Sequence, residues 1–295
     1  MTRYERLMRR LRSGAQIVID GGTGTEAERR GVPVLENAWS GGGALSHPDI
    51  VREIHEDYIG HGAEIIISNT FSTARHTLGD SEVEHQFEQY NRRGVELACE
   101  ARRAQQKPEV LVAGGISYWS FINKYPSLNI LAHDIAEQAA IMADAGADLL
   151  MLEMMVDIDR MLVTLEAAQT SGLPVWVGFS CEPDTNGNMC LLNGEPLEDA
   201  LASIGDKNVD VVTIMHTDIR YIDACLDITD EHWPGVVGVY AHSGKFVKPN
   251  WVFEGTISPA GYAAYCDRWL QRDVQIIGGC CGIRPDHIAM LSELV

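Results

Sequence analysis

Short apolar runs alternate with longer stretches of helical periodicity from one end of the chain to the other. Eight of these runs are aliphatic on both faces, which is typical of strands in a parallel sheet that is covered on both sides. The eight runs lie at residues 16–20, 64–68, 110–114, 148–153, 174–180, 209–214, 235–240 and 274–278. The pattern therefore predicts eight buried strands.

The intervals between the runs carry the signals of helix ends. Ser46 followed by Pro48 predicts the start of one helix, and Asp134 predicts the start of another. Pro285 predicts the start of the last helix. Repeated strand–helix units without a Pro- or Ser-rich linker predict an α/β protein of one domain, a (β/α)8 barrel over 1–295. An open doubly wound sheet is the alternative, but no GxGxxG motif follows the first strand.

Residues 1–14 are basic and lack the continuous apolar stretch of a secretory signal. Leu7 and Leu11 are spaced as on one face of a helix, so we expect a short amphipathic extension that caps the fold. The net charge of −19 disfavours nucleic acid and anionic membranes as partners. Seven cysteines, an odd number, argue against a disulfide framework. We therefore expect a cytoplasmic protein whose partners are small molecules.

Polar, glycine and sulfur groups gather at the carboxyl ends of the predicted strands, where barrel enzymes carry their chemistry. Cys280 and Cys281 are flanked by glycines after the last strand, and paired thiolates are natural zinc ligands. Small apolar fillers of a tight turn are the alternative reading. Glu153 ends an apolar run, where an unpaired carboxylate is costly to bury, so it either pairs with a structural cation or awaits a cationic ligand.

The glycine-rich segment 20–25 follows the first strand. Its backbone amides can approach a ligand closely, but Asp20 and the absence of a Gly-Lys-Ser/Thr sequence make it a poor phosphate loop. Amides beside a carboxylate suit a zwitterion better. A tight turn that only leads into a helix is the other possibility.

Four segments together resemble the homocysteine S-methyltransferase family, namely 20–26, 69–71, 150–153 and 276–282. The resemblance covers nearly the whole chain. It implies a (β/α)8 barrel and a zinc ion that activates the thiol of homocysteine for attack on a methyl group. It also implies that Asp20 and Glu153 are catalytic. The substrate-binding residues that it implies are Asp20, Gly21, Gly22, Thr23, Asn69, Trp119 and Glu153.

The chain departs from the family pattern at the metal. The family's third zinc ligand is a cysteine after strand six, and Met215 stands in its place here. After strand seven, His242 replaces the usual asparagine. We therefore expect His242, Cys280 and Cys281 to bind zinc, with His216 as the alternative nitrogen ligand.

A cationic methyl donor is best held by aromatic faces. Tyr118, Trp119 and Phe121 after strand three, with Trp39 in the first loop, are candidates for this role, although they could equally pack a loop over the barrel. The donor could be a sulfonium or a quaternary ammonium compound. A methyltransferase or demethylase with another acceptor, and an amino-acid-binding barrel without zinc, remain open. Self-association is an expectation from the resemblance.

Overall fold

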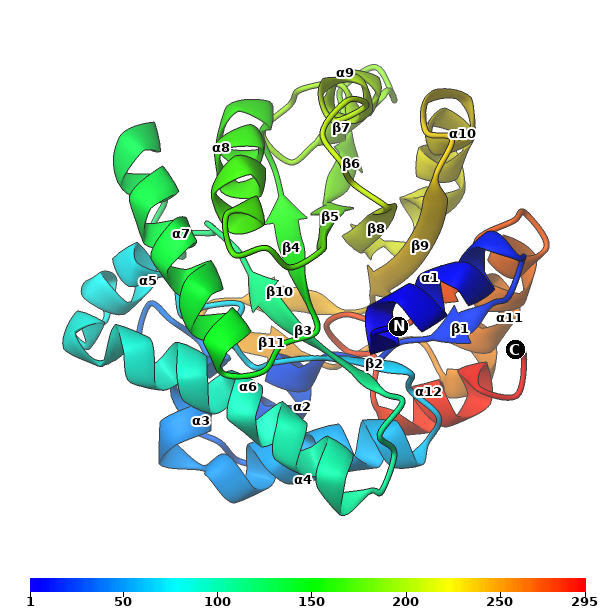
Figure 1. The fold of residues 1–295 in the computed structure, drawn as a ribbon. Helices are drawn as coiled ribbons and strands as arrows, with labels where there is room; N and C mark the ends of the chain where they lie inside the picture. The colour runs from blue at the N-terminus through cyan, green and yellow to red at the C-terminus, as the bar shows by residue number, and fades with distance from the viewer.

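The eight predicted strands are all present and form one parallel barrel in a computed structural model that describes residues 1–295 (Figure 1). The sheet order is β1-β12-β9-β8-β5-β4-β3-β2. Ile19 pairs with Ile65, and the Glu64 amide donates to the Val18 carbonyl at 2.8 Å, so the first and second strands close the ring. The barrel strands are β1 (Ile17–Val18), β2 (Ile65–Ile67), β3 (Leu111–Ile116), β4 (Leu149–Met155), β5 (Val175–Phe179), β8 (Val211–Asp218), β9 (Val236–His242) and β12 (Ile276–Ile277).

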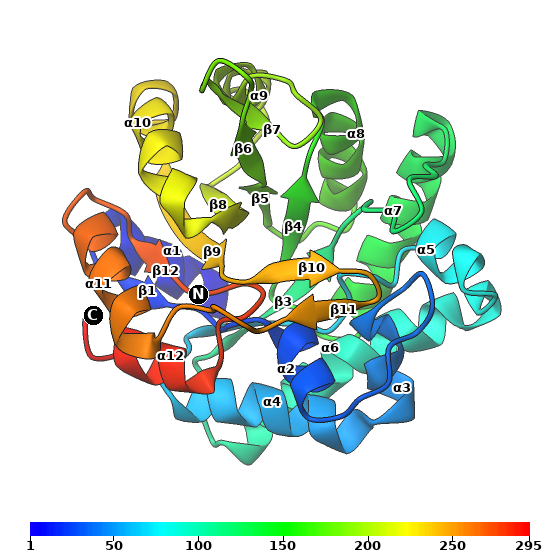
Figure 2. The same cartoon turned by 180° about the vertical axis from the view of Figure 1, so that it is seen from behind.

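Helices surround the barrel and cover the outer faces of its strands (Figures 1 and 2). This explains why the strands are apolar on both sides. The larger helices are α4 (Pro48–Gly60), α6 (Phe87–Ala104), α7 (Leu128–Asp144), α8 (Ile158–Gln169), α10 (Ile222–His232) and α11 (Pro259–Leu270). The shorter ones are α2 (Thr23–Arg29), α3 (Gly43–Ser46), α5 (Arg75–Asp80), α9 (Leu197–Ser203) and α12 (Pro285–Leu291). Three 3-10 turns lie at Ser40–Gly42, Glu84–Gln86 and Ile219–Tyr221. None of the helices has the length and apolar character that a membrane span requires.

One helix start differs from the prediction. Helix α7 begins at Leu128, six residues before Asp134, because Ser127 adopts the extended backbone that precedes a helix. Asp134 is instead buried inside the helix, and its carboxylate lies 3.4 Å from the Arg75 guanidinium. The starts at Pro48 and Pro285 are confirmed.

The N-terminal helix α1 (Arg3–Arg12) lies across one end of the barrel, as predicted (Figure 1). Leu7 and Leu11 are buried against the core. Its basic residues pair with carboxylates at the starts of the strands, as in the ion pairs of Arg10 with Glu64 and of Arg12 with Asp210. These ion pairs and the buried leucines hold α1 against this end of the barrel.

Two hairpins were not predicted. Strands β6 (Cys181–Pro183) and β7 (Met189–Leu191) follow β5, and strands β10 (Lys245–Val247) and β11 (Asn250–Val252) follow β9. The second hairpin lies over the end of the barrel opposite to α1 (Figure 2). It covers the carboxyl ends of the strands, where the candidate site lies.

Candidate active site

A pocket of about 150 Å³ opens at the carboxyl ends of the strands, under hairpin β10–β11. The loops after β1, β2, β3, β9 and β12 and the carboxyl-terminal parts of β4 and β8 contribute to its walls. Most of the predicted site residues line it: Gly21, Gly22, Thr23, Asn69, Trp119, Glu153, His216, Cys280 and Cys281. Asp20 and His242 are not among the lining residues.

Cys280 and Cys281 lie in the tight turn after β12 with their sulfurs 3.9 Å apart. The turn requires Gly282, whose φ of +82° belongs to the left-handed region and whose hypothetical Cβ would lie 2.0 Å from the Ser243 carbonyl oxygen. The hydrogen bond between the thiols lowers the pKa of Cys280 and raises that of Cys281. Cys280 is thus the more acidic of the two thiols.

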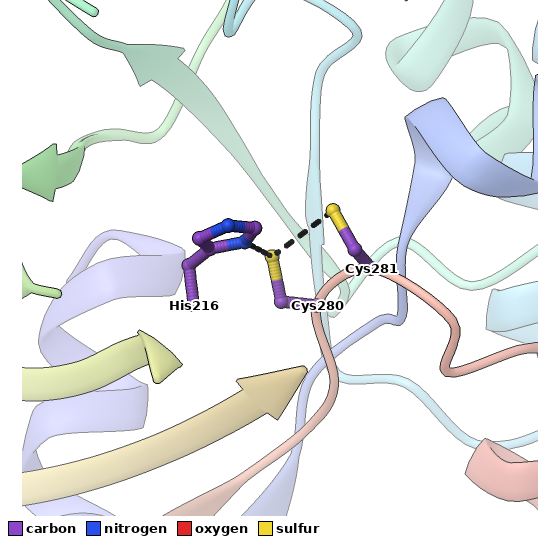
Figure 3. Close-up of side chains that lie close together, drawn as sticks. All are labelled: His216, Cys280 and Cys281. Carbon is purple, nitrogen blue, oxygen red and sulfur yellow. Dashed lines mark hydrogen bonds between the residues drawn. The ribbon is translucent and has the colours of Figure 1, made fainter. Parts of the chain in front are cut away.

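The nitrogen nearest to this sulfur pair comes from His216, the alternative candidate, and not from His242. The Nδ1 atom of His216 lies 3.4 Å from the sulfur of Cys280, and Figure 3 shows that sulfur between the imidazole and Cys281. The ligand atoms of these three residues all lie within 4.8 Å of one another. Two thiols and an imidazole in such a cluster are a suitable donor set for zinc.

A local irregularity of β8 directs His216 toward the sulfurs. The pairing of β8 with β9 changes register between Met215 and Asp218, and His216 has a φ of +42°, which is unusual for a residue with a side chain. Bulges of this kind turn a side chain toward a new direction and are common beside active sites. The Met215 sulfur accepts hydrogen bonds from Ser180 and from the Met154 amide. His216, rather than Met215, therefore occupies the place from which β8 can supply a third ligand.

His242 lies behind His216, with the two ring centroids 4.6 Å apart. Its Nδ1 is buried without a hydrogen-bond partner. Burial, reinforced by the neighbouring His216, lowers the pKa of His242 to about 4. His242 is thus a neutral ring packed against His216 and Trp251, and the ring supports the position of His216.

Glu153 reaches into the pocket from β4, and no hydrogen bond or ion pair neutralises its carboxylate. Burial raises the pKa of Glu153 well above its usual value, and the nearby Cys280 and Asp20 raise it further. Gly115 on β3 makes room for the carboxylate, because a Cβ there would lie 2.6 Å from Oε2 of Glu153. A buried acid without a partner in a pocket is suited to receive a cationic group of a ligand.

The structure alters the expected roles of Asp20 and Gly22. The Asp20 carboxylate accepts a hydrogen bond from the Ile67 amide at 2.7 Å, and the Gly22 amide donates to the Ile283 carbonyl at 2.9 Å. Both groups thus join strands and loops at the base of the pocket. Thr23 remains suited to bind a ligand, because its hydroxyl is buried without a partner. The Asn69 amide group donates to the Ser40 carbonyl at 3.1 Å.

Aromatic side chains form the outer part of the pocket. Trp39, Trp119 and Phe121 line it, as expected, but Tyr118 does not. The Tyr118 hydroxyl is fully buried and accepts hydrogen bonds from the Val156 and Asp157 amides, so Tyr118 holds the loop after β4.

Phe246 and Trp251 of the hairpin also line the pocket. Neither residue was predicted from the sequence. The available signal was a pair of aromatic residues on either side of a short turn after β9.

A model of the family described as homocysteine S-methyltransferase matches residues 17–295. The chain is 26% identical to homocysteine S-methyltransferase 1 of Zea mays, over 96% of this chain and 95% of that protein. It is 25% identical to a selenocysteine methyltransferase of Astragalus bisulcatus, over 96% of this chain and 93% of that protein. The homocysteine methyltransferase MmuM from Escherichia coli, in its metallated form, has the same fold, with a TM-score of 0.78, 24% identity and coverage of 95% and 96% of the two chains.

Proposed function

As a member of the homocysteine S-methyltransferase family, this chain is an S-methyltransferase, and we propose that it methylates the thiol of homocysteine with the aid of zinc. The methyl group comes from a sulfonium or quaternary ammonium donor. The observation that carries the proposal is the cluster of His216, Cys280 and Cys281 in the same pocket as the unpaired Glu153. The zinc would be held by these three residues, with His216 in place of His242. A zinc ion there would supply the positive charge that keeps the acceptor sulfur deprotonated.

The chain's own residues orient the acceptor. Glu153 holds its ammonium group, because this carboxylate has no other cation in the pocket. The Thr23 hydroxyl and the neighbouring backbone amide of Gly21 bind its carboxylate. Asp20 acts indirectly in this proposal, since its hydrogen bond to Ile67 fixes the base of the pocket. Binding both groups of the α-carbon fixes that end of the acceptor, and its side chain then carries the sulfur toward the cysteine pair.

The apolar outer pocket favours the reaction itself. A thiolate and a cationic donor react to give two neutral products: the sulfur–methyl bond forms, and the donor's sulfur or nitrogen keeps the electron pair of the broken bond. The opposite charges of the thiolate and the donor partly cancel in the transition state. Water stabilises the charged reactants more than this transition state and so raises the barrier, whereas a pocket that excludes water does not. Trp119 and Phe121 place aromatic faces beside the donor's methyl groups.

The decisive experiment is metal analysis of the purified chain with two matched histidine variants. We expect about one zinc per chain in the unmodified protein and in His242→Ala, and little zinc in His216→Ala. In the same preparations, methionine formation from homocysteine should follow the zinc content. Full zinc retention in both His216→Ala and Cys280→Ala would contradict the proposed ligand set.

Selenocysteine is the second acceptor to test, because two relatives that are 25% identical to this chain are named as selenocysteine methyltransferases. Comparing kcat/KM for homocysteine and for selenocysteine with the same methyl donor decides which acceptor this chain prefers. The odd number of cysteines supports a cytoplasmic location as part of the same proposal.

A further inference from the structure

The outer part of the pocket is an aromatic enclosure built from three separate segments. Trp39 comes from the first loop, Phe121 from the loop after β3, and Phe246 and Trp251 from the hairpin. Phe246 meets Trp39 edge-on at 6.3 Å between centroids and 72° between planes, and it meets Phe121 at 6.1 Å and 60°. Rings set at steep angles to one another form the walls of a box, which is the arrangement that binds methylated cations.

A single carboxylate, Glu28 on α2, ties two of these walls together. It accepts a hydrogen bond from the Trp39 indole at 3.0 Å and another from the Trp251 backbone amide at 3.0 Å. The negative charge at the edge of the Trp39 indole makes its face more attractive to a cation. Trp39 is held there although its φ of +42° is unusual, so the surrounding structure maintains this geometry at a cost.

The enclosure offers little to an anion. None of the 22 lining residues is Lys or Arg. The two polar side-chain hydrogens of the enclosure residues themselves are already engaged, because the Trp39 indole donates to Glu28 and the Trp251 indole donates to the Ser243 carbonyl at 3.2 Å. The unpaired Thr23 hydroxyl lies with the glycine segment, where the acceptor's carboxylate binds in the proposed function.

We propose that the methyl donor is a compact methylated cation without a carboxylate group, held by the enclosure of Trp39, Phe121, Phe246 and Trp251 with Glu28 behind it. This inference rests on the proposed function and narrows its donor. A carboxylate in the enclosure would lose its water without gaining a cation, which is unfavourable. For a trialkylsulfonium donor, the acceptor sulfur gains the methyl group, and the leaving dialkyl sulfide keeps the electron pair of the broken bond.

Binding can be tested without any turnover. Tetramethylammonium and glycine betaine differ by a carboxylate, and both should be titrated against the tryptophan fluorescence of the whole chain. We expect tetramethylammonium to bind at least tenfold more tightly. Trp39→Leu should weaken it about tenfold and Trp39→Phe much less, because phenylalanine keeps an aromatic face. Trp233→Phe, outside the pocket, is the control for the fluorescence change.

Turnover supplies the second readout, with trimethylsulfonium compared with dimethylsulfonioacetate at saturating homocysteine. The kcat/KM of each donor is divided by the rate constant of its uncatalysed reaction with a free thiolate. We expect this normalised kcat/KM to be at least tenfold higher for trimethylsulfonium than for dimethylsulfonioacetate. Equal or tighter binding of betaine would overturn the proposal. Loss of that binding in Lys248→Ala would then show that Lys248, just outside the enclosure, is the cation that receives the carboxylate. Binding of tetramethylammonium without methyl transfer from any donor would instead refute the proposed function and leave the cation site standing.

Discussion

Replacing Gly115 by alanine tests the role of Glu153 without touching its chemistry. The new Cβ would lie 2.6 Å from Oε2 of Glu153 and 3.0 Å from Cγ2 of Ile67. Ordinary contacts begin at 3.4 Å, so the carboxylate must retreat by about 0.8 Å, the difference between 3.4 and 2.6 Å. Ile67 belongs to the closed barrel wall and cannot move away as easily as the end of the glutamate side chain.

A displacement of this size is expensive for a group that orients a substrate. A misplacement of about 1 Å costs on the order of 100-fold in rate, which corresponds to about 2.7 kcal/mol of transition-state stabilisation. We therefore expect kcat/KM for the acceptor to fall about 30- to 100-fold in Gly115→Ala. Zinc content should not change, since the cysteine turn is not in contact with this position.

Gly114→Ala is the matched control, because successive residues of a strand face opposite sides. Its Cβ would meet the Met142 sulfur at 2.7 Å and Leu150 at 2.9 Å, on the side of helix α7. This variant should lose about 1–3 kcal/mol of stability through overpacking, yet keep its activity per folded molecule. Steady-state kinetics and thermal unfolding of both variants provide the measurements. An unchanged acceptor kcat/KM in folded Gly115→Ala would refute the assigned position of Glu153 in the site.

Three further predictions concern other parts of the molecule. Glu153→Gln should raise the acceptor KM; it should also raise Tm relative to the unmodified chain, by an amount that grows from pH 5 to pH 8. The reason is that burial raises the folded-state pKa of Glu153, so the unmodified chain loses stability as the pH rises above the unfolded-state value of about 4.3; a constant difference in Tm would argue against this. Leu11→Ala should cost about 2–5 kcal/mol in urea unfolding, since Leu11 is fully buried under the barrel. Gly282→Ala should destabilise the chain by more than about 3 kcal/mol, because of its positive φ and the Ser243 carbonyl in the way; a stable variant with full zinc content would show that the turn can rearrange.

The sequence by itself determined the architecture. Eight runs that are apolar on both faces require a parallel sheet that is covered on both sides, and the lack of a GxGxxG motif after the first run favoured a closed barrel over an open doubly wound sheet. The place of the site followed from the same reasoning, because the polar, glycine and cysteine residues all came at the carboxyl ends of the runs. The cysteine pair and Glu153 were identified for this reason, and both line the pocket.

Only the tertiary structure decided which residues meet one another there. The choice between His216 and His242 depended on a register shift in β8, which no local sequence pattern reveals. The carboxylate of Asp20 is already bonded to the Ile67 amide, although the two residues are 47 positions apart. Contacts of this kind arise when distant segments close the barrel, so their geometry depends on the packing of the whole ring of strands and not on the sequence of any one of them.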